Sequence, residues 1–351
     1  MDIVVLCGGW SNERDVSITS GSCVAAALRE RGHRVLLLDS YLGCREEYAD
    51  PRELFARPRE REHFRVAEEA PDLETLRGLR HQDNDSILGD NVLEICRCAD
   101  ITFLALHGEE GENGKLQAVL DVAGIRYTGS GYLGSALAMN KTLSKELFAQ
   151  NGILTPQGIT LYRETDRGPY RDVGFPCVVK PCSGGSSVGT SIVHNREEYE
   201  RAVELAFRYE AAVIVERYIH GREFTVGILA GAAMPVIEII PKDGFYDYKN
   251  KYQPGLTQEI CPAEISPELT AEIQRLGLAV HRALMIDVYS RVDFLQDAQD
   301  GKLYCLEANT LPGMTPTSLI PQMAAAQGKS FGELCEEIIA ASLARYEEGK
   351  A

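Results

Sequence analysis

The opening of the chain is the feature that most restricts its fold. Residues 2–7 (DIVVLC) form an almost continuous apolar run that ends at two glycines, which is typical of a strand buried on both faces of a parallel sheet. Apolar residues then recur at helical spacing up to Gly32, and a second apolar run follows at residues 34–38. This order predicts a βαβ unit, and ligands of such units bind at the carboxyl ends of the strands. Glu13 lies near that edge, either as a ligand-binding residue or as an acid that favours the start of the helix.

The length and charge of the chain limit the kinds of protein it can be. At 351 residues it is too long for one ordinary core and predicts two or three domains. No apolar run approaches the ~20 residues that span a bilayer. The short N-terminal run has acidic flanks, unlike a signal peptide, so we expect a cytoplasmic protein. The formal net charge of −16 disfavours wide contact with nucleic acid or anionic membranes. Ten cysteines without a regular framework predict reduced thiols.

Two stretches near the C-terminus predict a hairpin in which two acidic residues face each other. Residues 289–296 (YSRVDFLQ) and 302–309 (KLYCLEAN) both favour strands, and the Asp-Gly pair at 300–301 is a turn signal. With the turn at that place, Asp293 falls opposite Glu307.

The side chains of this hairpin predict a metal site. Side chains two residues apart in a strand share a face, so Glu307 and Asn309 project together while Leu306 and Ala308 face the core. With the opposing aspartate they supply two carboxylates and an amide oxygen, the hard ligands that suit a magnesium ion completed by phosphate oxygens. Arg291 lies on the same face. The alternative is a hairpin with polar residues on its solvated face.

A second stretch predicts contact with phosphates. A strand at residues 177–180 ends in Lys180, and the loop 182–189 contains three glycines and three serines. Such a loop exposes backbone N–H groups and hydroxyls without bulk, as closing over phosphates requires. The lysine can reach the same phosphates as a point charge. This is not a Walker A loop, because no GK[ST] sequence follows; a flexible hairpin is the alternative.

Glycines 129, 131 and 134 have GxGxxG spacing, a weak indication of a dinucleotide site. A dinucleotide-binding fold places this pattern at its first strand–helix turn, with an acid about 20 residues later. Here residues 135–151 are predicted to be helical throughout, with Lys141 inside the helix, and no strand ending in an acid follows at that distance. We therefore expect these glycines to form a domain hinge.

Residues 41–98 are charged and irregular, and their helical pieces are predicted to be solvated rather than core-forming. After them, an apolar strand at 100–106 leads to His107. This histidine is either a ligand-binding residue or a structural residue of the turn.

Acidic and basic residues later in the chain are candidates for nucleotide contact. An apolar strand ends at Glu216, and Glu223 opens the next strand. Acids and exposed backbone at strand ends can hydrogen-bond adenine and ribose. The aromatic and basic loop 245–252 adds Lys251 and Tyr252 as candidates for phosphate and substrate contact.

In this order, the motifs resemble the ATP-grasp superfamily and, within it, the D-alanine:D-alanine ligase family. The resemblance covers nearly the whole chain outside residues 41–98. Nine motifs carry it: GGWSNERDVS (8–17), LHGEEGENGKLQ (106–117), YTGSG (127–131), MNK (139–141), VKPCSGGSSVG (179–189), GREFTV (221–226), FYDYKNKY (245–252), SRVDF (290–294) and LEANTLPGMTPTSL (306–319).

The resemblance implies a mixed α/β (α+β) fold in which a parallel βαβ pre-ATP-grasp domain precedes a two-part ATP-grasp fold. The expected N-terminal domain is residues 1–129 with the insert at about 41–98. The central subdomain is expected at 130–215, and the C-terminal subdomain with the metal site at 216–351. The implied cofactors are ATP and two magnesium or manganese ions, and the implied partner is a second copy of the chain in a homodimer.

The resemblance also assigns roles to individual residues. ATP would be bound by Lys141, Lys180, Ser186, Ser187, Glu216, Arg217, Ile219, Glu223 and Lys251. The metal ions would be bound by Asp293, Glu307 and Asn309. Catalysis would depend on Glu13, Ser186, Tyr252, Arg291 and Gly313. Amino-acid substrate would contact Glu13, His107, Arg291, Ser318 and Leu319. One departure is Arg217, where family members often carry lysine.

The implied activity is the ATP-dependent joining of two D-alanines through an acyl phosphate, for peptidoglycan precursor synthesis. A carboxylate is a poor electrophile, so ATP must first convert it to an acyl phosphate. Water must be kept away from this intermediate, because it would hydrolyse the acyl phosphate. Three alternatives remain: a ligase for another pair such as D-alanine with D-serine, a non-catalytic ATP-binding regulator, and a dinucleotide oxidoreductase. The family's pattern associates Tyr252 with an amine acceptor rather than D-lactate.

Overall fold

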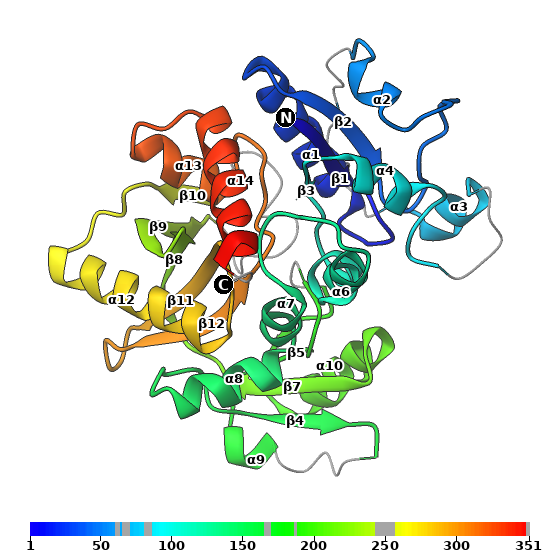
Figure 1. The fold of residues 1–351 in the computed structure, drawn as a ribbon. Helices are drawn as coiled ribbons and strands as arrows, with labels where there is room; N and C mark the ends of the chain where they lie inside the picture. Colours follow the sequence, from blue (N-terminus) through cyan, green and yellow to red (C-terminus); the bar gives the residue numbers. More distant parts are fainter. Residues whose placement is uncertain are drawn as a thin grey trace.

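The part of the chain that the structure describes builds three β-sheets from successive stretches of the sequence. The structure is a computed structural model, and it describes residues 1–59, 64, 71–80, 86–164, 170–185, 188–242 and 257–348. Within these residues a three-stranded sheet comes first, a four-stranded sheet second and a five-stranded sheet last. Figure 1 shows them around the middle of the molecule, with the first at upper right, the second at the bottom and the third at left. The mixed α/β fold class is as predicted.

The N-terminal sheet is the parallel βαβ unit that the sequence predicts. Its strands pair in the order β2-β1-β3, with Ile3 opposite both Val35 and Ile101. Residues 3–6 are fully buried, which explains the apolar run. Glu13 precedes α1, at the carboxyl end of β1. The elements are β1 (Asp2–Cys7), α1 (Arg14–Glu30), β2 (Arg34–Asp39) and β3 (Ile101–Leu104).

Residues 41–98 contribute to the core, so the prediction that their helices are solvated is wrong. The described part of this insert contains α2 (Glu53–Ala56), α3 (Leu73–Gly78) and α4 (Val92–Cys98). The core residues of α2 and α4 are at most 4% exposed and belong to the main hydrophobic cluster; they include Leu54, Phe55, Val92 and Ile95. Each helix covers only one or two turns, which is too short for helical periodicity to be recognised among many charged residues.

The segment predicted as one continuous helix, residues 135–151, is broken at Asn140. Helix α7 (Tyr132–Met139) ends there, and the Asn140 side chain accepts a hydrogen bond from Leu143 N–H at 3.0 Å, which caps α8 (Lys141–Gln150). Lys141 therefore lies in the first turn of a helix and not in its middle. Two short helices precede this pair, α5 (Glu109–Glu112) and α6 (Lys115–Val122).

The segment whose glycines predict a hinge is bound to the last helix, α14 (Phe331–Glu348). Gly129 N–H donates to Ser342 Oγ at 3.2 Å, and the Gly129 carbonyl accepts from the Arg345 guanidinium at 2.9 Å. Figure 1 shows α14 between the C-terminal sheet and the N-terminal part. Any bending at Gly129 would have to break these bonds.

The central sheet is antiparallel and carries the glycine–serine loop between β5 and β6. The strand order is β4-β7-β5-β6, and α10 (Arg196–Tyr209) packs on the sheet with Tyr199, Val203 and Phe207 buried. Lys180 lies in the strand that precedes the loop, as predicted. The remaining elements are β4 (Gly158–Tyr162), α9 (Tyr170–Val173), β5 (Cys177–Pro181), β6 (Ser191–Val193) and β7 (Ala212–Arg217).

The C-terminal sheet is antiparallel, with the order β10-β9-β8-β11-β12, and helices cover both faces. Val226 and Val292 pack with α12, whereas Ile237 and Tyr289 belong to the cluster that includes α13 and α14. That cluster also contains residues of β1 and β3, so the first and last parts of the chain share one core. The elements are β8 (Gly221–Leu229), β9 (Ala232–Pro241), β10 (Thr257–Ile260), α12 (Pro267–Ala283), β11 (Tyr289–Asp297), β12 (Leu303–Asn309) and α13 (Leu319–Ala326).

The β11–β12 hairpin has the predicted register but contains a bulge. Asp293 pairs with Glu307, as the sequence predicts, and the next pair is Phe294 with Cys305. Leu306 is the extra residue of a β-bulge. The bulge turns Leu306 toward a cavity, so the prediction that it faces the core is wrong.

Among the described residues, no helix is long and apolar enough to cross a membrane.

Two helical glycines predict opposite responses to alanine. A Cβ at Gly277 in α12 would lie 2.6 Å from Val226 Cγ1, whereas a Cβ at Gly78 in α3 would meet nothing within 4 Å. We expect Gly277→Ala to lower the free energy of unfolding by about 1–3 kcal/mol, the usual cost of overpacking. Gly78→Ala should leave it unchanged or raise it by up to about 1 kcal/mol through helix propensity. Urea denaturation of both variants measures the difference, and equal midpoints would contradict the described packing of α12.

Candidate active site

Two adjoining cavities open where the three sheets meet. The larger has a volume of about 440 Å³ and lies between the central and C-terminal sheets. The smaller, of about 80 Å³, lies between the C-terminal sheet and the N-terminal part. Lys141, Gly184 and Glu307 line both cavities, so a molecule in one would be next to a molecule in the other.

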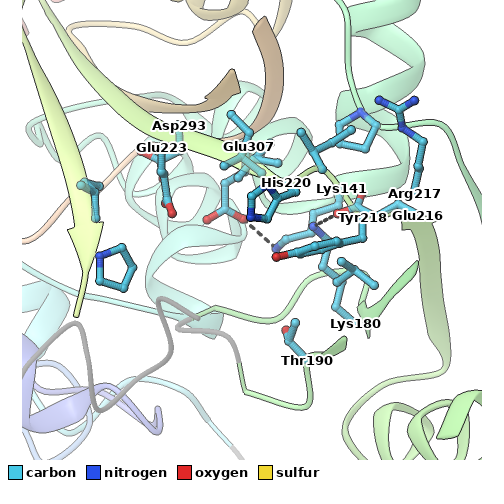
Figure 2. A pocket seen from close by; sticks show the side chains of 18 of the residues that line it. Lys141, Lys180, Thr190, Glu216, Arg217, Tyr218, His220, Glu223, Asp293 and Glu307 are labelled. Carbon is cyan, nitrogen blue, oxygen red and sulfur yellow. Dashed lines mark ion pairs between the residues drawn. The ribbon is translucent and has the colours of Figure 1, made fainter. Parts of the chain in front are cut away.

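The larger cavity brings together most of the residues predicted to bind nucleotide. Figure 2 shows their side chains around it, and they come from α8, β5, β7, β8 and the β11–β12 hairpin. The predicted residues in its wall are Lys141, Lys180, Glu216, Arg217, Ile219, Glu223, Asp293 and Glu307. Leu306, Val178 and Ile239 add apolar surface. A wall of lysines at one end and apolar residues beside it suits a ligand with an anionic part and a flat apolar part.

Glu216 in the wall of this cavity is buried between two lysines. Lys145 Nζ lies 2.8 Å from one carboxylate oxygen and Lys180 Nζ lies 2.5 Å from the other, while Glu216 is 2% exposed. Burial acts to raise the pKa of Glu216, but the two ammonium groups outweigh it and lower that pKa to about 2. Burial lowers the pKa of Lys145, whereas Glu216 and Glu307 outweigh burial at Lys180 and raise its pKa. The group carries one net positive charge, which favours an anion nearby.

Lys145 is a residue that the sequence analysis missed. Its ammonium also donates to Thr155 Oγ1 at 2.6 Å, and the Thr155 hydroxyl donates to the Cys305 carbonyl at 2.9 Å. Lys145 thereby connects α8 to β7 and to the strand that carries Glu307. The spacing of Lys141 and Lys145 by four residues, which places both on one face of a helix, was the available signal.

The hairpin residues predicted to bind metal lie together at the junction of the two cavities. Arg291 donates to both oxygens of Asp293 at 3.0 and 2.8 Å, and Thr225 Oγ1 donates to the same carboxylate at 2.7 Å. Asn309 Nδ2 donates to Asp293 Oδ2 at 3.1 Å, which leaves its amide oxygen on the other side. Glu307 lies 3.3 Å from Lys141 Nζ.

This donor set fits a magnesium ion that also binds phosphate. It consists of two carboxylates on paired residues and one amide oxygen, all of them hard ligands. Among the described residues no group of three or more His, Cys, Asp or Glu is placed to hold a metal ion. Because magnesium keeps waters and takes phosphate oxygens as further ligands, two carboxylates and an amide are enough protein ligands for it.

The smaller cavity is lined by the predicted catalytic residues Glu13, Arg291 and Gly313, together with His107. A Cβ at Gly185 would lie 2.8 Å from a Glu13 carboxylate oxygen, so the glycine–serine loop begins directly beside this acid. A carboxylate, a guanidinium and a cavity of this size suit a small zwitterion such as an amino acid.

His107 connects the N-terminal part to the loop after β12. Its Nε2 lies 2.9 Å from Ser20 Oγ, and its Nδ1 lies 2.9 Å from the Leu311 carbonyl oxygen. Burial lowers the pKa of His107, which favours the neutral ring. The histidine is therefore a structural link that also forms part of the cavity wall, and its contact with substrate stays a prediction.

Glu112 is a second residue that the sequence analysis missed. It lines the smaller cavity and accepts a hydrogen bond from Gly108 N–H at 2.6 Å. Burial, with a further contribution from Glu13, raises the pKa of Glu112 to about 8. With its pKa raised to about 8, Glu112 adds little negative charge beside Glu13 at neutral pH. Its place in a glycine-rich turn, LHGEEGENG, was the only signal in the sequence.

Some predicted site residues lie elsewhere or outside the described part of the chain. Ser318 Oγ accepts from Thr315 N–H at 3.0 Å and lies beside Gly313, but neither Ser318 nor Leu319 lines the two cavities. Leu319 is buried at the start of α13. Ser186, Ser187, Lys251 and Tyr252 lie outside the described residues.

Comparison with known proteins identifies relatives over the full length of the chain. A family model described as D-ala D-ala ligase N-terminus matches residues 2–130, and one described as D-ala D-ala ligase C-terminus matches residues 148–340. The D-alanine–D-alanine ligase of Pediococcus pentosaceus is 43% identical, with 100% of each chain covered. That of Lacticaseibacillus casei is 42% identical, with 99% of this chain and 98% of the relative covered.

Solved structures agree with these relatives. A D-alanine–D-alanine ligase from Bacillus anthracis in complex with ATP has 31% identity and a TM-score of 0.77, with 99% of each chain covered. The VanG D-Ala:D-Ser ligase from Enterococcus faecalis has 27% identity and a TM-score of 0.72, with 97% of this chain and 99% of that chain covered.

The buried group around Glu216 predicts that Lys145 is needed for stability and for nucleotide binding. We expect Lys145→Met to lower the free energy of unfolding by about 3 kcal/mol, the lower end of the cost of breaking a buried ion pair, because Glu216 keeps Lys180. The KM for nucleotide should rise as well. In the matched control Lys302→Met, the lost partner is Asp300 at 3.5 Å and the lysine is 61% exposed, so the loss should stay below about 1 kcal/mol. If the two variants lose similar amounts of unfolding free energy, the contact between Lys145 and Glu216 does not stabilise the fold as described.

Proposed function

Because this chain belongs to the D-alanine–D-alanine ligase family, we propose that it joins two D-alanines into D-alanyl-D-alanine with ATP, through an acyl phosphate. The dipeptide would enter peptidoglycan precursor synthesis. The observation that supports the proposal is the shared wall of the two cavities, because a nucleotide in the larger cavity would lie next to an amino acid in the smaller one.

In the first step, the first D-alanine would be activated. Its ammonium would bind Glu13, with neutral Glu112 beside it, so its carboxylate points toward Lys141 at the junction of the cavities. Lys141 and Lys180 would hold the phosphates, and the apolar part of the larger cavity would hold the adenine. Magnesium bound by Asp293, Glu307 and Asn309 would neutralise phosphate charge. The carboxylate oxygen attacks the terminal phosphorus, the bond to ADP breaks, and an acyl phosphate forms.

In the second step, the amine of the second D-alanine would attack the acyl carbon. The tetrahedral intermediate carries an oxyanion, and we assign Arg291 and the Gly313 N–H as its donors. Both residues line the smaller cavity. When the intermediate collapses, phosphate leaves with its bonding electrons and the amine loses a proton. Ser318 and Leu319 would receive the carboxylate of this second D-alanine at the start of α13.

Other assignments come from the family resemblance, and of their residues Arg217, Ile219 and Glu223 also line the larger cavity. Ser186 and Tyr252 would join Glu13 in a network that closes the site, and Ser187, Arg217, Ile219, Glu223 and Lys251 would contribute to nucleotide binding. Residues 1–129, 130–215 and 216–351 would act as the three units of the fold. β7 ends at Arg217, two residues beyond the second of these boundaries. We expect the reaction to take place in the cytoplasm, where ATP is supplied.

We further propose that the chain is a homodimer. Three exposed apolar side chains, from the start of α7 and the turn after α12, line one open hollow, and a fourth at the end of α6 follows Asp121, which lines it too. They are Val122 at 92% exposure, Met285 at 59%, Tyr132 at 54% and Leu133 at 40%. A two-fold contact through this face, called here the α6–α7 patch, would bury all four on both copies.

The ligase reaction is tested with ATP, magnesium and D-alanine. We expect phosphate release and a product with the mass of the dipeptide. Arg291→Ala should lower kcat by about 10²–10³, the usual loss on removing an oxyanion donor, and a chelator should abolish activity until magnesium or manganese is restored. Arg275→Ala is the control, since this arginine pairs with Glu272 on the exposed face of α12. No phosphate release with D-alanine alone, but release when D-serine is added, would favour a D-alanine–D-serine ligase.

The dimer is tested by sedimentation of Tyr132→Lys, which places a charge on a residue that lines the hollow of the α6–α7 patch. We expect wild-type protein to sediment as a dimer and the variant as a folded monomer. The control is Leu205→Lys, a 37%-exposed leucine on α10, which should stay dimeric. If the wild-type protein sediments as a monomer, the proposed dimer is wrong.

A further inference from the structure

The described part of the insert at residues 41–98 folds back against the end of β2. Gly89 N–H donates to the Ser40 carbonyl at 2.8 Å, and the backbone of Cys44 exchanges two hydrogen bonds with the Asn91 side chain, at 3.1 and 3.2 Å. A Cβ on Gly89 would lie 2.4 Å from Gly43 N, so the two segments touch backbone to backbone. This contact requires glycine at position 89. It holds the later part of the insert, around Gly89, next to the first residues of the insert, which include Tyr41.

From there, a stack of three side chains leads to the turn that carries Glu13. The Arg80 guanidinium lies 4.6 Å from the centre of the Tyr41 ring, and the Tyr41 ring lies 4.9 Å from the Trp10 ring at 47°. Arg80 also donates to the carbonyls of Ser86 and Leu88, which binds it to the rest of the insert. Cation–π and aromatic contacts of this kind restrict the orientation of each ring.

The turn at residues 8–13 needs such support, because its own backbone is permissive. Gly8 and Gly9 have φ values of +73° and +83°. Glycine adopts positive and negative φ about equally easily, so these two residues do not by themselves fix the turn. Inside the turn, Arg14 donates to the Gly9 carbonyl at 2.9 Å and Glu13 N–H donates to Ser11 Oγ at 3.0 Å. Trp10 lies between these two contacts in the sequence, and its ring contacts Tyr41 at the start of the insert.

The insert packs against the turn at residues 8–13 but does not line the smaller cavity. Ile87 and Leu88 enclose a small void of about 20 Å³ together with Trp10 and His107. The smaller substrate cavity, in contrast, is lined by residues outside 41–98. The insert therefore acts on the cavity only through the residues it supports.

We propose that the insert positions the first amino-acid subsite: Arg80 and Tyr41 hold Trp10, and Trp10 fixes the turn that presents the Glu13 carboxylate. The inference rests on the proposed ligase function, because that function is what identifies the cavity beside Glu13 as a D-alanine subsite. Trp10, Tyr41 and Arg80 are positioning residues, since they act through Glu13 and touch no reacting atom.

The experiment isolates the first subsite by replacing the second D-alanine with hydroxylamine. Its nitrogen attacks the acyl phosphate, a C–N bond forms, the C–O bond to phosphate breaks, and D-alanine hydroxamate is released after loss of a proton. For Trp10→Ala and Arg80→Ala we expect the KM for D-alanine to rise about tenfold, as for loss of one aromatic contact. The KM for ATP and kcat should stay near the wild-type values.

Two further variants separate positioning from general damage to the fold. Trp10→Phe keeps an aromatic ring against Tyr41 and should restore the KM for D-alanine. Arg57→Ala is the matched control within the insert, because its guanidinium contacts Glu46 and the Glu47 carbonyl at 2.9 and 2.6 Å, away from the turn. It should behave as wild type in both KM values.

Amide hydrogen exchange of residues 8–13 gives a readout that does not depend on activity. We expect faster exchange there in Trp10→Ala and Arg80→Ala, but not in Arg57→Ala. If Trp10→Ala leaves the KM for D-alanine unchanged, or raises both KM values equally, the proposal is wrong. If wild-type protein forms neither dipeptide nor hydroxamate, the ligase function fails, and unchanged exchange in Trp10→Ala would then overturn the positioning role as well.

Discussion

The burial of Glu216 between Lys145 and Lys180 is the interaction on which the rest of the site depends. A carboxylate at 2% exposure is tolerated only because two ammonium groups lie within 2.8 Å of it. The two lysines come from α8 and β5, and Glu216 is the residue before the last of β7. One charge cluster thus fixes three elements of the central part. Its remaining positive charge explains how a chain of net charge −16 can still attract phosphates.

The fold and much of the site could be predicted where the sequence carries a periodic or turn signal. The opening βαβ unit followed from apolar runs, and the pairing of Asp293 with Glu307 followed from the turn at Asp300. Leu306 was misplaced because a bulge changes the alternation of side chains without any mark in the sequence. Lys145 was missed because its role exists only once α8 meets β7. The roles of Ser186 and Tyr252 stay predictions.

The smaller cavity depends on residues far apart in the sequence, and this explains why all three sheets are needed. His107 follows β3 in the N-terminal part, yet it touches the Leu311 carbonyl oxygen after the last strand of the C-terminal sheet. Glu13 and Gly185 approach each other across the boundary between the first and second sheets. No single sheet encloses this cavity, because it lies where the edges of the three sheets meet. A common core from β1 to α14 holds those edges in place.

The attachment of α14 to Gly129 and to the first sheet has a consequence for the order in which the chain can fold during synthesis. The N-terminal strands leave the ribosome first, but the helix that covers part of their core is made of residues 331–348. Part of the apolar core of the first sheet therefore stays uncovered until α14 has been translated, near the end of the chain. A message truncated shortly before Phe331 would therefore yield a nascent chain with that face exposed, which is a substrate for chaperones and proteases.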